Sequence, residues 1–183
     1  GDLHHCVNYA LRQYGCPERS PAEIRRFVGN GARRLLEQSL PGLPTDPSTD
    51  EILETYTHYY NAHCKDNTFP YPGILDALAA LRQSHPVAIV SNKPHDSVAA
   101  LCREYFGDVY ALGTQPDCPR KPAPDMVFKA MADIGVDTCI YVGDSEVDVL
   151  TAKNAGVPCV CVLWGFRDRD DMEAVGGSIY CEK

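Results

Sequence analysis

IYVGDSEVD, at residues 140–148, is the stretch of sequence that decides the fold. It opens with a short apolar run that predicts a buried strand. Gly143 allows a sharp turn where the strand ends, so we expect Asp144 to point into the crevice beyond it and Asp148 to lie in a helix's first turn. Ligands of open α/β sheets bind at the carboxyl ends of the strands. Two carboxylates there suit Mg²⁺, which prefers a few carboxylate oxygens, water and substrate phosphate.

Another interpretation of the same residues needs no ligand. Asp144 then caps the following helix, and Asp148 is a solvated acid near the positive end of that helix. Both interpretations require a strand before Gly143 and a helix after it.

On both sides of this stretch, short apolar runs alternate with amphipathic segments from residue 68 onward. Strands are predicted at residues 87–90, 109–112, 140–142, 158–163 and 178–181, and helices at residues 74–82, 96–105, 125–134 and 147–155. Such alternation predicts an α/β domain with a Rossmann-like parallel sheet covered on both faces. Pro70, Pro72 and Gly73 mark the boundary with the preceding segment, so the predicted domains are residues 1–67 and 68–183.

Residues 1–67 have the pattern of a small helical domain. Apolar residues from Leu3 to Tyr14 recur at helical spacing, and Gly15 is placed to end that helix. Capping boxes at residues 20–23 and 48–51 predict the starts of two more helices. A turn at residues 29–31 comes between them, before another apolar run.

The composition is that of an ordinary globular protein, with 44% hydrophobic and 23% charged residues among 183. Without an 18-residue apolar run or a signal-peptide pattern, the chain is expected to be cytoplasmic and to bind no membrane. A net charge of −8 disfavours nucleic acid as a partner, and a cluster at Arg25, Arg26, Arg33 and Arg34 suits one small anion. Nine cysteines without a C-x-x-C pair indicate reduced thiols and disfavour zinc.

Two further polar segments accompany the predicted strands and helices. SNKP, at residues 91–94, directly follows the strand at residues 87–90, where a hydroxyl and backbone amides can bind an anion. In RKPAPD, at residues 120–125, two prolines restrict the backbone around Lys121, whose charge can neutralise a phosphoryl group. The alternatives are a strand-to-helix turn capped by Ser91 or Asn92, and an unconstrained surface lysine.

Together and in this order, the three segments resemble the second, third and fourth motifs of the haloacid dehalogenase-like superfamily. In such enzymes an aspartate attacks phosphorus, and water then hydrolyses the acyl phosphate. The resemblance implies that Ser91 and Asn92 bind the phosphoryl oxygens and that Lys121 balances charge. It also implies that Asp144 ligates Mg²⁺, while Asp148 supports the metal shell and the lysine.

The helical part resembles one branch of that superfamily. FVGNGARRLL, at residues 27–36, is similar to the cap signature of phosphoglycolate phosphatases, and FPYPG at residues 69–73 is similar to the same branch. The resemblance implies a cap domain in which Gly29, Asn30 and Gly31 approach the substrate closely. Arg33 would hold the substrate carboxylate through a bidentate pair. For Arg33 and its neighbour Arg34, a solvated helix face is the alternative.

The superfamily's first motif, an apolar strand ending in Asp-x-Asp, has no counterpart before the first predicted helix. Asp2 has no strand before it, so we do not identify it as the nucleophile. We therefore expect an aspartyl-phosphate reaction whose nucleophile is absent from this chain, with the first core strand and the last helix missing. The missing strand belongs in the middle of the sheet, and its loss leaves two facing rows of unpaired backbone groups. A fragment, a segment supplied from elsewhere and a shortened gene product all remain open.

The predicted function is that of a Mg²⁺-dependent phosphomonoester hydrolase, similar to phosphoglycolate phosphatase, that acts on a small phosphorylated metabolite as a monomer or homodimer. A pyrophosphatase or a sugar-phosphate mutase stays open within the same class, because the fold does not set specificity. From other classes, the alternatives are a non-catalytic phosphate- or metal-binding remnant and a strand-pairing interaction protein.

Overall fold

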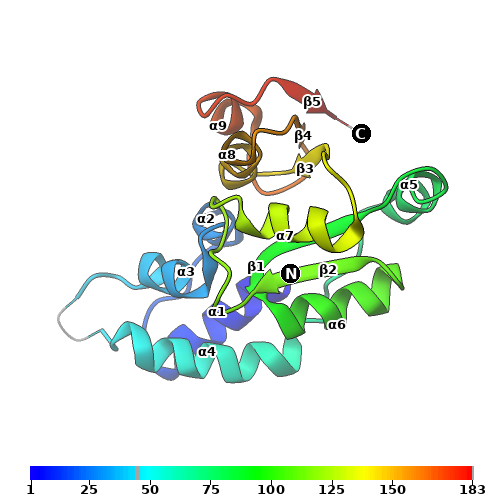
Figure 1. The fold of residues 1–183 in the computed structure, drawn as a ribbon. Helices are drawn as coiled ribbons and strands as arrows, with labels where there is room; N and C mark the ends of the chain where they lie inside the picture. The colour runs from blue at the N-terminus through cyan, green and yellow to red at the C-terminus, as the bar shows by residue number, and fades with distance from the viewer. Residues whose placement is uncertain (44–45, 183) are drawn as a thin grey trace. The chain divides into compact units, whose positions relative to one another are not determined.

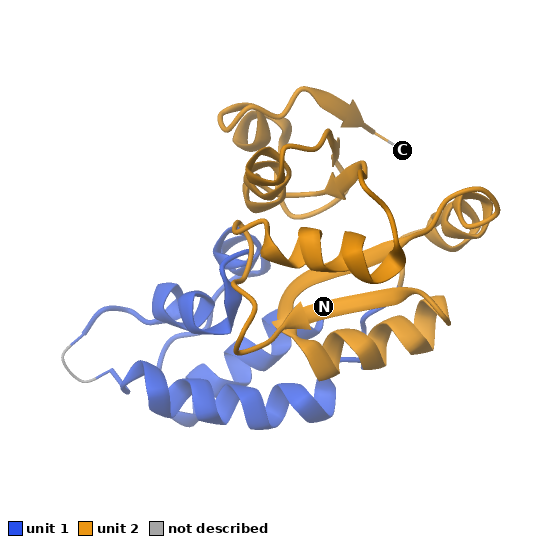
Figure 2. Cartoon of the chain, viewed as in Figure 1, with its two compact units in different colours: residues 1–69 blue, residues 70–183 orange. Residues whose placement is uncertain are grey.

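Residues 1–43 and 46–182 are described in a computed structural model, in which the chain divides into Gly1–Phe69 (unit 1) and Pro70–Lys183 (unit 2) (Figure 2). The division falls just before the turn that contains Pro72 and Gly73. Within the described ranges, no helix combines the length and the hydropathy needed to cross a membrane. Each unit has a hydrophobic core of its own.

Side-chain caps fix where two of the helices of unit 1 begin. The helices are α1 (Asp2–Gln13), α2 (Pro21–Phe27), α3 (Gly31–Ser39) and α4 (Thr49–His63) (Figure 1). The Ser20 hydroxyl accepts a hydrogen bond from Glu23 N–H at 3.3 Å, and the Glu23 carboxylate accepts one from Ser20 N–H at 2.8 Å. Ser48 and Glu51 make the same pair of bonds, at 3.3 and 2.9 Å. Both predicted capping boxes are therefore confirmed.

The core of unit 1 lies largely between α1 and α4. Buried side chains at helical spacing on the two helices meet there: Cys6, Val7, Ala10, Leu11, Ile52, Tyr56 and Tyr60. Full burial of one large apolar side chain contributes about 1.5–3 kcal/mol. Burial of these residues therefore supplies the main stabilisation of a unit that contains no strand among its described residues.

The carboxylate of Asp2 ties the start of α1 to the end of unit 1. Asp2 is only 4% exposed. Its oxygens accept hydrogen bonds from Asn67 N–H at 2.9 Å, from Asn67 Nδ2 at 3.1 Å and from the Thr68 hydroxyl at 2.8 Å. Burial by itself would raise the pKa of Asp2, but these hydrogen bonds outweigh it and lower the pKa. Asp2 is thus a structural residue of unit 1.

Unit 2 alternates helices and strands along the chain. Its elements are α5 (Ile74–Leu81), β1 (Ala88–Pro94), α6 (His95–Phe106), β2 (Tyr110–Thr114), α7 (Asp125–Ile134), β3 (Tyr141–Gly143), α8 (Glu146–Ala155), β4 (Cys159–Val162), α9 (Arg169–Glu173) and β5 (Ile179–Cys181) (Figure 1). Every named strand pair is parallel. The predicted α/β class with parallel strands is confirmed.

The strands of unit 2 form two sheets among the described residues, in the orders β1-β2 and β3-β4-β5. In the second sheet Gly143 lies opposite Cys161, which in turn lies opposite Tyr180. We predicted one parallel sheet that lacks a strand in its middle, which leaves two facing edges unpaired. Among the described residues, β1 and β3 are each paired along one edge only. Val90 of β1 nevertheless packs against the hydrophobic cluster that contains Tyr141 of β3, so the two sheets share a core.

Apolar residues lie exposed at and beside β3. Ile140 and Val142 are 67% and 60% exposed, although the side chains of a parallel strand are ordinarily buried on both faces of a sheet. The apolar helix α5 has no buried residue.

Candidate functional site

The segment SNKP lies inside β1 rather than after it. We expected the strand to end at residue 90, but β1 continues to Pro94 because Pro94 still pairs with Thr114 of β2, after an irregularity that follows Val90. The Ser91 hydroxyl accepts a hydrogen bond from Lys93 N–H at 3.2 Å. The N-cap of α6 is Pro94, so neither Ser91 nor Asn92 caps that helix. Capping therefore does not explain this segment.

The side-chain amide of Asn92 holds the main chain of Lys121. Asn92 Nδ2 donates to the Lys121 carbonyl at 3.0 Å, and Lys121 N–H donates to Asn92 Oδ1 at 2.8 Å. The bond between Lys121 and Pro122 is cis. The structure thus brings together two residues that are 29 positions apart in the sequence.

Asp148 is the hub of the site. Its carboxylate accepts hydrogen bonds from Lys121 Nζ at 2.7 Å, the Tyr141 hydroxyl at 3.2 Å, the Ser145 hydroxyl at 2.6 Å and Asp144 N–H at 3.1 Å. The side chains of Lys121 and Asp148 are only 13% and 7% exposed. Burial would raise the pKa of Asp148, but the Lys121 charge and the hydrogen bonds outweigh burial and lower it. The alternatives of a surface lysine and a solvated acid are therefore wrong.

These contacts form a chain of hydrogen bonds from one sheet to the other. Asn92 of β1 holds Lys121, Lys121 binds Asp148, and Asp148 accepts the N–H of Asp144, which directly follows β3. Gly143 is needed at the turn, because a Cβ at this position would lie 2.2 Å from Asp148 Cβ. Four of the sequence-predicted residues are thus brought into one polar network at strand ends.

Asp144 does not cap α8, whose N-cap residue is Ser145. Asp144 Oδ2 instead accepts a hydrogen bond from Phe166 N–H at 2.9 Å. Burial, together with the neighbouring Asp148 carboxylate, raises the pKa of Asp144. Burial and the Asp148 charge outweigh the opposing effect of Lys121, so a bound cation would stabilise the ionised form of Asp144.

Asp144 can supply part of the coordination of a Mg²⁺ ion. Residues 1–43 and 46–182 contain no group of three His, Cys, Asp or Glu side chains arranged to hold a metal ion. Mg²⁺ is commonly held by one or two carboxylates, with water and substrate phosphate as its other ligands. Asp144 can supply one carboxylate of this kind.

The remaining predicted residues belong to unit 1. Gly29 and Gly31 have φ values of 134° and 83°, in the region that favours glycine. Asn30 is the N-cap of α3 but makes no side-chain capping bond. Arg33 Nη2 pairs with Asp50 at 2.5 Å, and both side chains are exposed. The interaction with Asp50 raises the pKa of the Arg33 guanidinium. Arg33 thus already binds a carboxylate, at the surface of its unit.

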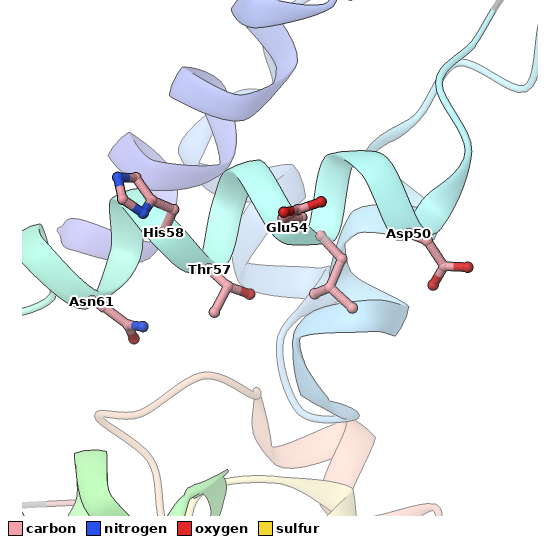
Figure 3. Close-up of a pocket in the computed structure, with 6 residues that line it drawn as sticks. Asp50, Glu54, Thr57, His58 and Asn61 are labelled. Carbon is pink, nitrogen blue, oxygen red and sulfur yellow. The ribbon is translucent and has the colours of Figure 1, made fainter.

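Asp50 also lines an open pocket along α4, with a volume of about 460 Å³. The other lining residues are Leu53, Glu54, Thr57, His58 and Asn61 (Figure 3). All of them except Leu53 are exposed. The pocket is therefore a shallow polar depression on this unit rather than an enclosed ligand cavity.

Sequence reasoning missed three contributors to the unit 2 network. Tyr141 and Ser145 donate to Asp148, although both were taken only as parts of the strand and the turn. Phe166 donates to Asp144 from a loop 22 residues further along the chain. Adjacent parallel strands end at the same edge of a sheet, so the loop after β4 could have been considered as a neighbour of Asp144.

The sequence and the fold are both similar to those of known hydrolases. Residues 2–162 match the family model described as haloacid dehalogenase-like hydrolase. The chain is 36% identical over 172 residues to a phosphoglycolate phosphatase of Rhodobacter capsulatus, covering 90% of the chain and 78% of that protein. It is 33% identical over 176 residues to phosphoglycolate phosphatase 1 of Pseudomonas aeruginosa, covering 91% of the chain and 65% of that protein.

A solved structure shows the same similarity. A protein of Lactobacillus delbrueckii subsp. bulgaricus, proposed to be a phosphoglycolate phosphatase, superposes with a TM-score of 0.90 at 32% identity. The match covers 100% of the chain and 87% of that protein.

Proposed function

The chain belongs to the haloacid dehalogenase-like hydrolases. From this premise we propose that it is a Mg²⁺-dependent phosphomonoester hydrolase that acts on 2-phosphoglycolate or a similar small phosphorylated acid. The observation that carries this proposal is the hydrogen-bond chain from Asn92 through Lys121 and Asp148 to Asp144. It places a buried ammonium group and a carboxylate of raised pKa in one network at strand ends. Such a pair can neutralise a phosphate and hold its metal ion.

Each residue of the unit 2 site has a distinct role in this proposal. The Ser91 hydroxyl binds a phosphoryl oxygen, and Lys121 balances the negative charge that gathers in the transition state. Asp144 ligates Mg²⁺, which would polarise the phosphoryl group when bound. Asp148 fixes Lys121 and the turn that carries Asp144. Asn92 positions the main chain of Lys121 and need not touch the substrate.

The nucleophilic carboxylate is proposed to stand on a strand between β1 and β3. Each of these strands is paired along one edge only, and none of the described strands ends in Asp-x-Asp. A parallel strand in this position would pair with both open edges and would end beside the polar network. Its carboxylate would attack the phosphorus and break the P–O bond to the substrate alcohol, which leaves. Water would then hydrolyse the acyl phosphate, releasing inorganic phosphate and restoring the carboxylate.

Phosphate release from 2-phosphoglycolate, with and without Mg²⁺, tests this proposal. The 183-residue chain is expected to bind inorganic phosphate together with Mg²⁺ in calorimetry but to turn over little substrate. Adding a peptide with an apolar strand that ends in Asp-x-Asp should raise the metal-dependent rate. The same peptide with Asn for the first Asp is the matched control. Failure to bind phosphate and Mg²⁺ together would refute the site, and rapid metal-dependent release by the chain alone would refute the external nucleophile.

The Arg33→Ala variant is expected to weaken use of 2-phosphoglycolate more than use of a neutral phosphate ester. A charge-assisted pair with the substrate carboxylate contributes roughly 1.5–3 kcal/mol, which corresponds to a loss of about 10- to 100-fold in kcat/KM for the acidic substrate alone. The measurement is kcat/KM for both substrates, in the chain supplied with the nucleophile strand.

Arg34→Ala is the matched control for Arg33→Ala. Arg34 is an exposed neighbour on the same helix and pairs with Glu37, so both substrates should be affected little by its loss. If Arg33→Ala lowers kcat/KM equally for both substrates, Arg33 does not hold the substrate carboxylate.

A further inference from the structure

The loop between β4 and α9 reaches the carboxylate of Asp144. Phe166 N–H donates to Asp144 Oδ2 at 2.9 Å, and Arg167 N–H donates to the Asp144 carbonyl at 3.2 Å. The loops meet because β3 and β4 are parallel neighbours, with Gly143 opposite Cys161. Asp144 is thus held through both its side chain and its main chain.

The Asp144 carboxylate fits against residue 165 only because Gly165 has no side chain. A Cβ at residue 165 would lie 2.1 Å from Asp144 Oδ2 and 2.2 Å from Asp144 Cβ. Real Cβ atoms do not approach other heavy atoms so closely, so either Asp144 or the loop would have to move. Gly165 has no left-handed backbone conformation that would explain a glycine here. The close approach of Asp144 is therefore what requires it.

An ion pair fixes the loop against the turn that carries Asp144. Arg167 Nε lies 2.7 Å from Glu146 Oε2, and Arg167 Nη2 donates to Glu146 Oε1 at 3.2 Å. Arg167 is only 8% exposed. One hydrogen bond and one close charge contact between the two groups restrain both their distance and their orientation. The pair therefore joins the two loops rigidly, two residues away from Asp144.

We infer that Gly165 and Arg167 are positioning residues that set the affinity of the site for Mg²⁺. They hold the Asp144 carboxylate in one orientation, with Oδ2 accepting the hydrogen bond from Phe166 N–H. This inference rests on the proposed function, in which Asp144 ligates Mg²⁺. Partners that orient a metal ligand typically change metal affinity by about 10- to 100-fold when they are removed.

The test is a calorimetric titration of the 183-residue chain with Mg²⁺ alone. Gly165→Ala is expected to weaken Mg²⁺ binding about 10- to 100-fold. Arg167→Gln should also weaken binding, and Arg167→Lys should restore part of the loss because it keeps the charge but not the paired contacts. Arg169→Gln is the matched control, since Arg169 pairs with Glu182 at the surface of unit 2, and the affinity of this variant for Mg²⁺ should be unchanged.

Each outcome of the titration supports or overturns a defined part of this scheme. Unchanged Mg²⁺ affinity in both Gly165→Ala and Arg167→Gln overturns the positioning role and leaves the proposed function intact. Absence of Mg²⁺ binding by the wild-type chain overturns the ligand role of Asp144 and the inference with it. If Gly165→Ala does not fold, as judged by the fluorescence of Trp164, the two Arg167 variants decide the inference. If Arg167→Gln weakens Mg²⁺ binding and Arg167→Lys weakens it equally, the positioning role of Arg167 is overturned as well.

Discussion

Replacing Asp148 with alanine is expected to destabilise unit 2 by about 3–5 kcal/mol, the cost typical of breaking a buried ion pair. The change leaves the Lys121 ammonium, which is 13% exposed, without its counter-charge. It also removes the acceptor for the Tyr141 and Ser145 hydroxyls. Because domains of this size are stable by only about 5–15 kcal/mol, such a loss should be plain in denaturation.

Urea denaturation followed by the fluorescence of Trp164 measures this effect. The chain has one tryptophan, and it lies in unit 2, so its signal reports that unit. Glu182→Ala is the matched control, because Glu182 pairs with Arg169 at the surface and exposed pairs contribute about 1 kcal/mol or less. An equal loss of unfolding free energy in the two variants would show that the contacts of Asp148 do not stabilise unit 2 more than an exposed ion pair does.

Asp144→Asn is expected to reduce Mg²⁺-dependent turnover on the order of 100-fold or more, since a bound metal ion supplies several kcal/mol of transition-state stabilisation. The asparagine keeps an oxygen for Phe166 N–H, so the loop contact survives. The measurement is phosphate release as a function of Mg²⁺ concentration, in the chain supplied with the nucleophile strand. Near-normal activity at low Mg²⁺ would refute the ligand role of Asp144.

The same variant is expected to be more stable than the wild type when no metal is present. Burial and the Asp148 charge raise the pKa of Asp144 above its ordinary value of 3.8. A carboxyl group with a raised pKa contributes stability below its unfolded-state pKa, and that contribution is lost as the pH rises through the folded-state pKa. At pH 7 with a chelator, Asp144→Asn should therefore resist more urea than the wild type, and the difference should shrink below about pH 4. A pH-independent difference would contradict this electrostatic origin.

Local signals in the sequence predicted most elements of unit 2, and tertiary pairing explains where they failed. The helix at residues 125–134 was predicted with the bounds of α7, because Pro124 opens it and Gly135 ends it in the left-handed region. The end of β1 was placed four residues too early, since its pairing with β2 has no local signal. Helix α9 was missed because five residues are too few for a periodic pattern.

The candidate site was predictable where its residues follow strands in a recognisable order. Lys121, Asp144 and Asp148 were identified in this way, and the structure joins them. The contact between Glu146 and Arg167 was not foreseen, because it spans 21 positions and depends on which strands are neighbours. Unpaired strand edges were expected in the middle of the sheet, and β1 and β3 each have one unpaired edge among the described residues.

The tie between Asp2 and Asn67 brings two distant points of the chain together and closes residues 2–67 into a loop. Lengthening a closed loop costs only about 0.6 kcal/mol for each doubling of its length. Insertions and substitutions within α2, α3 and the start of α4, where Arg33 and Asp50 lie, can therefore accumulate while the network around Asp148 stays unchanged. Under the proposed function, residues 2–67 can change in evolution so that the protein recognises a different acid, while the phosphoryl-transfer site of unit 2 is kept.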